Sequence, residues 1–313
     1  MIKQEAPPLH HRKRQLVANI PVNKYTKSIA SFIILLSFYF LGYFTAPVVV
    51  VQPQQINTIQ QSTNPPAVVD HNRFSTQCVN PVAPQLVRKT ILDRVFNGTS
   101  PWLNFPPAHV IPLLRPRRIK GWGSNGAVFE TLIREVRPKT IIEVGTFLGA
   151  SALHMSELTH QLGLNETQIL CIDDFRGWPG FKDKFLKDLA MVNGDVLLLQ
   201  QFMQNVVHEK ATESILFMPF STSSALEKLC EWGVFGDLIE VDAGHDFHSA
   251  WSDINKAYKI LRPPGGVIFG HDYFTSADNK GVRRAVNLFA KLNNLRVQTH
   301  GQHWVIHPAA DTT

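Results

Sequence analysis

Cysteine is scarce in this 313-residue chain, and so is net positive charge beyond its first 27 residues; each scarcity excludes a class of protein. Three cysteines, Cys78, Cys171 and Cys230, are too few for a disulfide-stapled scaffold and leave at least one thiol unpaired. Their number does not decide between a reducing and an oxidising compartment. Residues 1–27 hold six Lys and Arg against one Glu, which is +5 of the formal net charge of +6. The +1 left for the rest of the chain gives no basic surface of the kind that binds nucleic acid.

Charge is absent altogether from residues 29–51, which are rich in Ile, Leu, Phe, Tyr and Val. As an α-helix this segment would be about 35 Å long, enough to cross a hydrocarbon core of about 30 Å. A cleaved secretory signal is the alternative, but it would have a shorter apolar core and a small-residue cleavage site, for which residues 45–47 are a poor candidate. The sequence therefore predicts a transmembrane anchor.

Basic residues flank this predicted anchor on one side only. By the positive-inside rule, residues 1–28 form a cytosolic tail and the remainder of the chain lies across the membrane. Residues 52–84 are rich in Gln, Asn, Pro, Ser and Thr, which predicts a flexible stem, and residues 85–313 form a luminal domain. This type II, single-pass layout is typical of enzymes of the Golgi and other endomembranes. Asn97 and Asn165 each begin an Asn-x-Thr triplet and are candidate glycan acceptors there.

Short β-branched runs alternate with amphipathic helical segments through the predicted luminal domain. Strands that alternate with helices imply an α/β fold with a doubly wound, mostly parallel sheet of the Rossmann type. The last two runs flank the turn at 300–302 and predict an antiparallel C-terminal hairpin, which brings the sheet to seven strands. The predicted strands are 140–144, 168–174, 214–218, 237–242, 264–273, 295–299 and 303–307. The predicted helices are 85–96, 126–136, 150–158, 196–207, 223–232, 250–261 and 279–292, with an irregular segment at 104–116 and an insertion at 175–194.

The first predicted strand runs directly into a glycine-rich turn and then into a helix. The spacing is E-x-G-x-x-x-G, from Glu143 through Gly145 to Gly149, and differs from the G-x-G-x-x-G of dinucleotide binders. A strand, glycine turn and helix in this order bring backbone N–H groups close to a ligand. The glycines are expected where a Cβ would block the ligand or the turn. An ordinary tight turn with two glycines is the alternative reading.

Acidic residues stand at the carboxyl end of four predicted strands: Glu143, Asp173, Asp242 and Asp272. The carboxyl ends of parallel strands meet at one rim of the sheet, where ligands bind in open α/β folds. Asp173 lies 24 residues beyond Gly149, close to the spacing of about 20 at which an acid binds ribose hydroxyls. A turn or helix cap, by Asp173 or by its neighbour Asp174, is the alternative. The four acids together predict a ligand site at this rim.

The fourth and fifth predicted strands end in Val-Asp242-Ala-Gly-His245-Asp and Gly-His271-Asp272-Tyr. With the glycine turn, these motifs resemble the class I S-adenosylmethionine-dependent methyltransferases, and most of all the macrocin-type sugar O-methyltransferases, over residues 125–308. The resemblance implies an O-methyltransferase whose acceptor is a glycan or a small hydroxylated metabolite. The cofactor-binding residues that it implies are Glu143, Gly145, Thr146, Gly149, Ser151, Asp173 and Asp242.

The same resemblance implies a divalent metal, Mg²⁺ or Mn²⁺, held by Asp242, His271 and Asp272, with His245 as the base. Oxygen and imidazole ligands suit these ions. This chain departs from the pattern because His271 precedes Asp272 where relatives often carry a second acid or amide beside the last ligand. Two rivals remain open at this stage. One is a catalytically silent relative that binds cofactor or glycan, and the other is a hydroxylase-like enzyme with two histidines and a carboxylate at iron.

Overall fold

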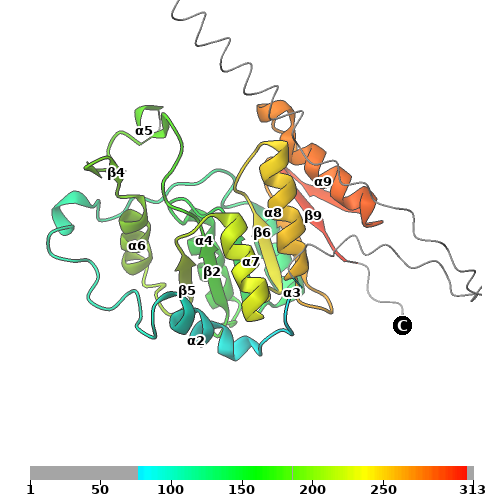
Figure 1. Cartoon of the computed structure of the whole chain (residues 1–313), viewed down its shortest axis with the longest axis horizontal. Helices are drawn as coiled ribbons and strands as arrows, with labels where there is room; N and C mark the ends of the chain where they lie inside the picture. Colours follow the sequence, from blue (N-terminus) through cyan, green and yellow to red (C-terminus); the bar gives the residue numbers. More distant parts are fainter. Residues whose placement is uncertain (1–76, 185, 309–313) are drawn as a thin grey trace, which may run out of the picture. The chain divides into compact units, whose positions relative to one another are not determined.

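The computed structural model describes residues 77–184 and 186–308 (Figure 1). The predicted cytosolic tail, the predicted anchor at 29–51 and most of the predicted stem lie outside the described residues. Within the two described ranges, no helix has both the length and the apolar character needed to span a bilayer.

A seven-stranded sheet lies at the centre of the described domain. Its strands are β1 (Thr140–Val144), β2 (Gln168–Ile172), β5 (Ile215–Met218), β6 (Leu238–Val241), β7 (Val267–Gly270), β8 (Val297–His300) and β9 (His303–Ile306). Their order across the sheet is β5-β2-β1-β6-β7-β9-β8. Strand β9 pairs antiparallel with both of its neighbours, and the other pairs are parallel. The mostly parallel sheet and the C-terminal hairpin predicted from the sequence are confirmed.

Helices cover both faces of this sheet, as Figure 1 shows. One face carries α2 (Pro84–Val95), α7 (Thr222–Trp232), α8 (Phe247–Lys259) and α9 (Gly281–Leu292), and the other carries α3 (Ala127–Val136), α4 (Ala150–Gln161) and α6 (Leu198–His208). Successive strand residues point to opposite faces, so Ile142 packs in the first core and Ile141 in the second. Burial on both faces explains why the strands read as continuous apolar runs.

The predicted insertion forms a small unit over the face that carries α6. It contains the short helix α5 (Phe181–Lys184) and a two-stranded hairpin, β3 (Met191–Val192) with β4 (Asp195–Val196). Phe181, Leu186 and Leu189 anchor it in the core that they share with α3, α4 and α6. Two single 3₁₀ turns complete the described elements, η1 (Ile111–Leu113) within the predicted irregular segment and η2 (Ala277–Asn279) before α9.

Residues 77–83 are fastened to the end of α7. Cys78 and Cys230 form a disulfide, while Cys171 is a buried free thiol. The backbone N–H of Val79 donates to the carbonyl of Cys230 (3.2 Å), and that of Val82 donates to the carbonyl of Gly233 (2.8 Å). The domain therefore includes these residues before α2, which the sequence assigns to the end of the stem.

We predict that this disulfide stabilises the domain measurably. It closes a loop of 152 residues, and its loss in Cys78→Ser/Cys230→Ser should lower the free energy of unfolding by about 2–4 kcal/mol. For a domain of this size, the Tm should then fall by roughly 5–15 °C in scanning calorimetry. Thiol titration in denaturant without reductant should detect one thiol per chain. Three thiols together with an unchanged Tm would contradict the pairing.

Candidate functional site

The site lies where the strand order reverses, between β1 and β6. From β1 the chain winds outward through β2 to β5, and from β6 it winds the other way through β7. The carboxyl ends of the two central strands border the crevice in which α/β sheets bind ligands. Gly145, directly after β1, has φ +93°, and a Cβ there would lie 2.2 Å from the carbonyl oxygen of Asp242. Glycine is therefore required for the turn to rest against the chain that leaves β6, which is one of the two reasons expected from the sequence.

Asp173 holds this glycine turn in place. Its Oδ2 accepts the backbone N–H groups of Thr146 (3.0 Å) and Phe147 (2.8 Å), and its Oδ1 accepts that of Phe175 (2.7 Å). Burial raises the pKa of this carboxyl, and the three N–H donors oppose that rise. The exposed Asp174 turns away and accepts from its own loop, at the N–H of Arg176 (2.9 Å). Of the two adjacent acids, only Asp173 bonds the glycine turn.

Glu143 lies beneath the turn and not at its surface. It belongs to β1 and is fully buried, where its carboxylate accepts the hydroxyls of Thr146 (2.6 Å) and Ser151. Burial raises its pKa to about 7, although the two hydroxyls favour the charged form. Glu143, Thr146 and Ser151 therefore lie together beneath the turn, and their part in binding the cofactor stays a prediction. Their observed contacts bind them to one another and shape the turn from below.

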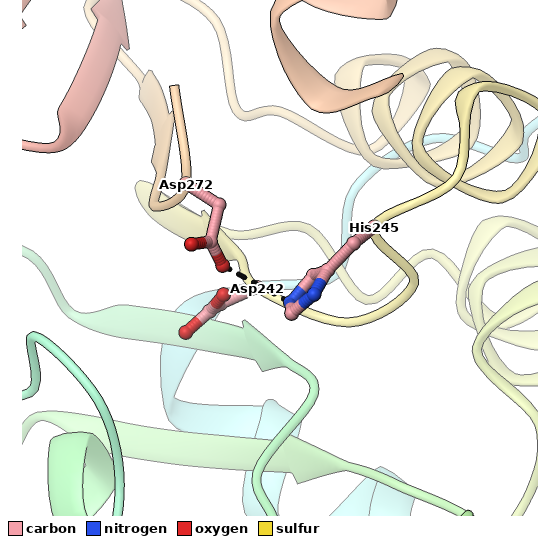
Figure 2. Close-up of side chains that lie close together, drawn as sticks. All are labelled: Asp242, His245 and Asp272. Atoms are coloured by element: carbon pink, nitrogen blue, oxygen red, sulfur yellow. Dashed lines mark ion pairs between the residues drawn. The ribbon is translucent and has the colours of Figure 1, made fainter. Parts of the chain in front are cut away.

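Asp242, His245 and Asp272 converge at the neighbouring strand ends (Figure 2). Asp242 follows β6 directly, and Asp272 follows β7 by two residues. The loop after Asp242 brings His245 back over both carboxylates, and Asp246 ends that loop by capping α8 at the N–H groups of His248 (2.9 Å) and Ser249 (3.1 Å). Nε2 of His245 lies 3.0 Å from Oδ2 of Asp272, and one ligand atom from each of the three side chains lies within 4.8 Å of the others.

The charges in this cluster depend on one another. Burial raises the pKa of Asp242 to about 6. Burial also opposes ionisation of Asp272, but the imidazoles of His245 and His271 outweigh it and hold the pKa of Asp272 below its usual range. The hydrogen bond to Asp272 in turn raises the pKa of His245. Asp272 therefore ionises readily beside His245, whereas Asp242 gives up its proton less readily.

His271, predicted as a metal ligand, lies at the edge of this group. Its Nδ1 is 3.4 Å from Oδ2 of Asp272, without the alignment of a hydrogen bond. Its ring packs against that of His303 at 4.7 Å between centroids and leaves no room for a Cβ on Gly123. The three potential ligand atoms that cluster most tightly thus come from Asp242, His245 and Asp272, with His245 in the position predicted for His271.

A cavity of about 890 Å³ opens beside His271. The segment before α3, the start of α4 and the turn of the β8–β9 hairpin line it, and its polar lining residues are Lys120, Ser124, Asn125, Thr131, His271, His300, Gln302 and His303. Burial lowers the pKa of His303 to about 4, so this ring is neutral at physiological pH. The lining includes no carboxylate.

Sequence reasoning missed two parts of the site. Glu240 is buried beside Glu143 in register, and burial followed by the charge of Glu143 raises its pKa. The repeated triplet Ile-Glu-Val at 142–144 and 239–241 is the signal that could have revealed it. The cavity walls at 119–126 and 300–303 were missed because loop residues carry no periodic signal.

Part of the chain is similar to known methyltransferases. Residues 142–273 match the family model described as a methyltransferase domain. No curated protein sequence matches the chain significantly. Among solved structures, a putative O-methyltransferase from Klebsiella pneumoniae is similar at 18% identity, a TM-score of 0.43 and coverage of 73% of this chain and 92% of its own. An O-methyltransferase from Bacillus cereus in complex with SAH is similar at 15% identity, a TM-score of 0.43 and coverage of 71% and 96%.

These similarities to solved structures are too weak to assign a function to the chain. The assignment rests on the family model, which spans the glycine turn, Asp173, the loop with His245, and Asp272. The order of the strands agrees with it, because the sheet is of the kind expected for the class I enzymes. Residues 142–273 are therefore a methyltransferase domain, and the activity that this domain indicates is methyl transfer from S-adenosylmethionine.

Proposed function

We propose that the protein transfers the methyl group of S-adenosylmethionine to a hydroxyl of a glycan or a small hydroxylated metabolite. The observation that carries this proposal is the contact of His245 with Asp272 (3.0 Å) beside the crevice between β1 and β6. A carboxylate-oriented imidazole next to the cofactor crevice is what proton removal from a hydroxyl requires.

The proton and methyl movements follow from that contact. In the neutral imidazole, Nε2–H donates to Asp272 and leaves Nδ1 as the acceptor for the proton of the hydroxyl. As this proton leaves, the acceptor oxygen forms a bond to the methyl carbon and the carbon–sulfur bond of the sulfonium breaks. The products are the methyl ether and S-adenosylhomocysteine, and His245 releases its proton to solvent. Asp272 stabilises the imidazolium form in the interim.

A divalent cation fits the same residues. Asp242 and Asp272 offer carboxylate oxygens, and His245 or His271 offers an imidazole nitrogen. This donor set suits Mg²⁺ or Mn²⁺, which acidify and orient a bound hydroxyl. A hydroxylase-like iron site is less well supported, because His245 and His271 both contact the same oxygen, Oδ2 of Asp272.

We also propose that the methyltransferase domain is luminal and anchored by residues 29–51. The support is the charge-free run, the basic segment that precedes it alone, and the disulfide between Cys78 and Cys230. Disulfides persist in the secretory compartments and are rare in the cytosol. The proposal therefore has one line of support that is independent of the hydropathy of the anchor.

The first prediction separates the two adjacent acids. Asp173→Asn should weaken S-adenosylhomocysteine binding by about tenfold or more, since hydrogen bonds to charged groups contribute about 1.5–3 kcal/mol. Asp174→Asn is the matched control, because that carboxylate faces its own loop, and its affinity should stay within about twofold. Calorimetric titration measures both. Equal effects of the two changes would remove Asp173 from the cofactor site.

The second prediction concerns the base and the cation. His245→Ala should slow methyl transfer by roughly 10²–10⁴ while leaving S-adenosylmethionine affinity nearly unchanged. Asp242→Asn and treatment with EDTA should both abolish turnover, and Mg²⁺ or Mn²⁺ should restore only the EDTA-treated enzyme. Full activity in excess EDTA would exclude the cation and leave His245 with Asp272 as the working pair.

The third prediction concerns topology. In sealed microsomes, protease added outside should remove only the N-terminal tail of a few kilodaltons, because in the proposed topology the membrane protects the rest of the chain. Immunoblotting with an antibody against the methyltransferase domain follows the fragment. Digestion of the whole domain without detergent would exclude a luminal location.

A further inference from the structure

Two tryptophans are exposed, while the other four are buried or partly buried. All six tryptophans fall within the described residues, and only Trp122 and Trp178 are exposed, at 45% and 44% of their surface. A large aromatic ring left in water forgoes stabilisation that burial would give it. Clustered exposed apolar rings therefore indicate a binding surface more strongly than isolated ones do.

These two rings meet a third, Phe147, in the glycine turn. The ring centroids are 5.7 Å apart for Trp122 and Phe147, 5.5 Å for Phe147 and Trp178, and 6.2 Å for Trp122 and Trp178. The three residues come from the segment before α3, the turn after β1 and the insertion. We call this cluster of Trp122, Phe147 and Trp178 the aromatic platform.

A buried neighbour holds Trp178, and buried contacts fix the segment that leads to Trp122. Trp178 packs on Phe181 (5.3 Å), which is only 5% exposed, and Gly177 at φ +69° permits this because a Cβ there would lie 2.6 Å from the Phe181 ring. On the other side, buried Asn205 of α6 accepts from the N–H of Arg118 (2.8 Å) and donates to its carbonyl (2.8 Å). The exposure of the rings therefore belongs to an ordered framework.

The shape of the platform limits what can bind to it. The rings contact one another at interplanar angles of 30–58°, so they form a continuous surface and not a box with space between its walls. The ammonium of Lys120 already lies 5.5 Å from the centroid of the Trp122 ring, so the chain itself supplies the cation that this ring attracts. A continuous apolar surface suits a ligand with a broad apolar face.

The residues that flank Trp122 in the sequence line the neighbouring cavity together with polar side chains. Gly121 and Gly123, on either side of Trp122, line the cavity, and so do Ser124, Asn125 and Gln302. These hydroxyl and amide groups can bond hydroxyls, while the rings meet C–H groups. A pyranose ring offers both, because its C–H bonds form one face and its hydroxyls project from the rim.

We propose that the aromatic platform binds a sugar ring of the methyl acceptor, with Trp122 and Trp178 as specificity-determining residues. This inference rests on the proposed function for the identity of the acceptor. The binding itself can be measured without methyl transfer, so the two can fail separately.

The test is saturation-transfer NMR on the full chain in detergent, with methyl glycosides of mannose, galactose, xylose and rhamnose and with open-chain sorbitol. At least one glycoside should bind through its C–H protons, and sorbitol should not. Trp122→Ala and Trp178→Ala should each weaken that binding by about tenfold, whereas Trp178→Phe should retain most of it. Leu292→Ala removes a side chain that is 66% exposed at the end of α9 and is the control without effect.

S-adenosylhomocysteine affinity, measured by calorimetry in the same variants, should stay within about threefold. The inference is wrong if no glycoside binds, if sorbitol binds equally well, or if both alanine variants bind glycosides normally. A parallel loss of S-adenosylhomocysteine affinity would also overturn it and make the rings a cover for the cofactor. Glycoside binding without methyl transfer would contradict the proposed function alone. Methyl transfer that is unchanged in Trp122→Ala and Trp178→Ala would contradict only the role of the aromatic platform.

Discussion

A Cβ atom on Gly145 would lie 2.2 Å from the carbonyl oxygen of Asp242, so only glycine lets the turn after β1 rest against the chain that leaves β6. That contact joins the two halves of the doubly wound sheet at the point where a ligand would enter. Asp173 then fixes the turn from the other side by accepting two of its N–H groups. The cofactor crevice and the cluster around Asp242 consequently share one rigid wall, and a change in either would move the other.

The two glutamates buried beneath the glycine turn destabilise the fold. Glu143 and Glu240 stand side by side on β1 and β6, both buried, and Oε2 of Glu240 has no hydrogen-bond partner. Burial raises the pKa of each, so the pair holds a proton where exposed carboxyls would have lost theirs. Two valines or leucines would pack there more favourably. The fold thus tolerates a destabilised interior directly beneath the turn that has to accept a charged cofactor, as functional sites often do.

The sheet could be predicted because its strands are buried on both faces and read as unbroken apolar runs. The carboxyl-end position of Asp173, Asp242 and Asp272 followed from the same runs. Side-chain direction could not be predicted in this way. Whether His245 or His271 joins the two aspartates depends on the path of the loop between Asp242 and the Asp246 cap, which no periodicity encodes. Glu143 was placed correctly in its strand. Its carboxylate can be buried because it accepts the hydroxyls of Thr146 in the turn and Ser151 in the helix, and strand periodicity does not reveal these partners.

The disulfide between Cys78 and Cys230 fixes residues 77–83 to one end of the domain. Cys230 lies in the last turn of α7, a helix that returns from the carboxyl end of β5 toward the amino ends of the strands. Arg262 places Val82 at the same end of the sheet, because it donates to the carbonyl of Val82 and forms an ion pair with Asp237, just before β6. Residues 77–83 thus lie at the end of the sheet opposite the strand ends that carry Asp242 and Asp272. Residues 77–83 therefore do not cover the side from which an acceptor would approach the strand-end site.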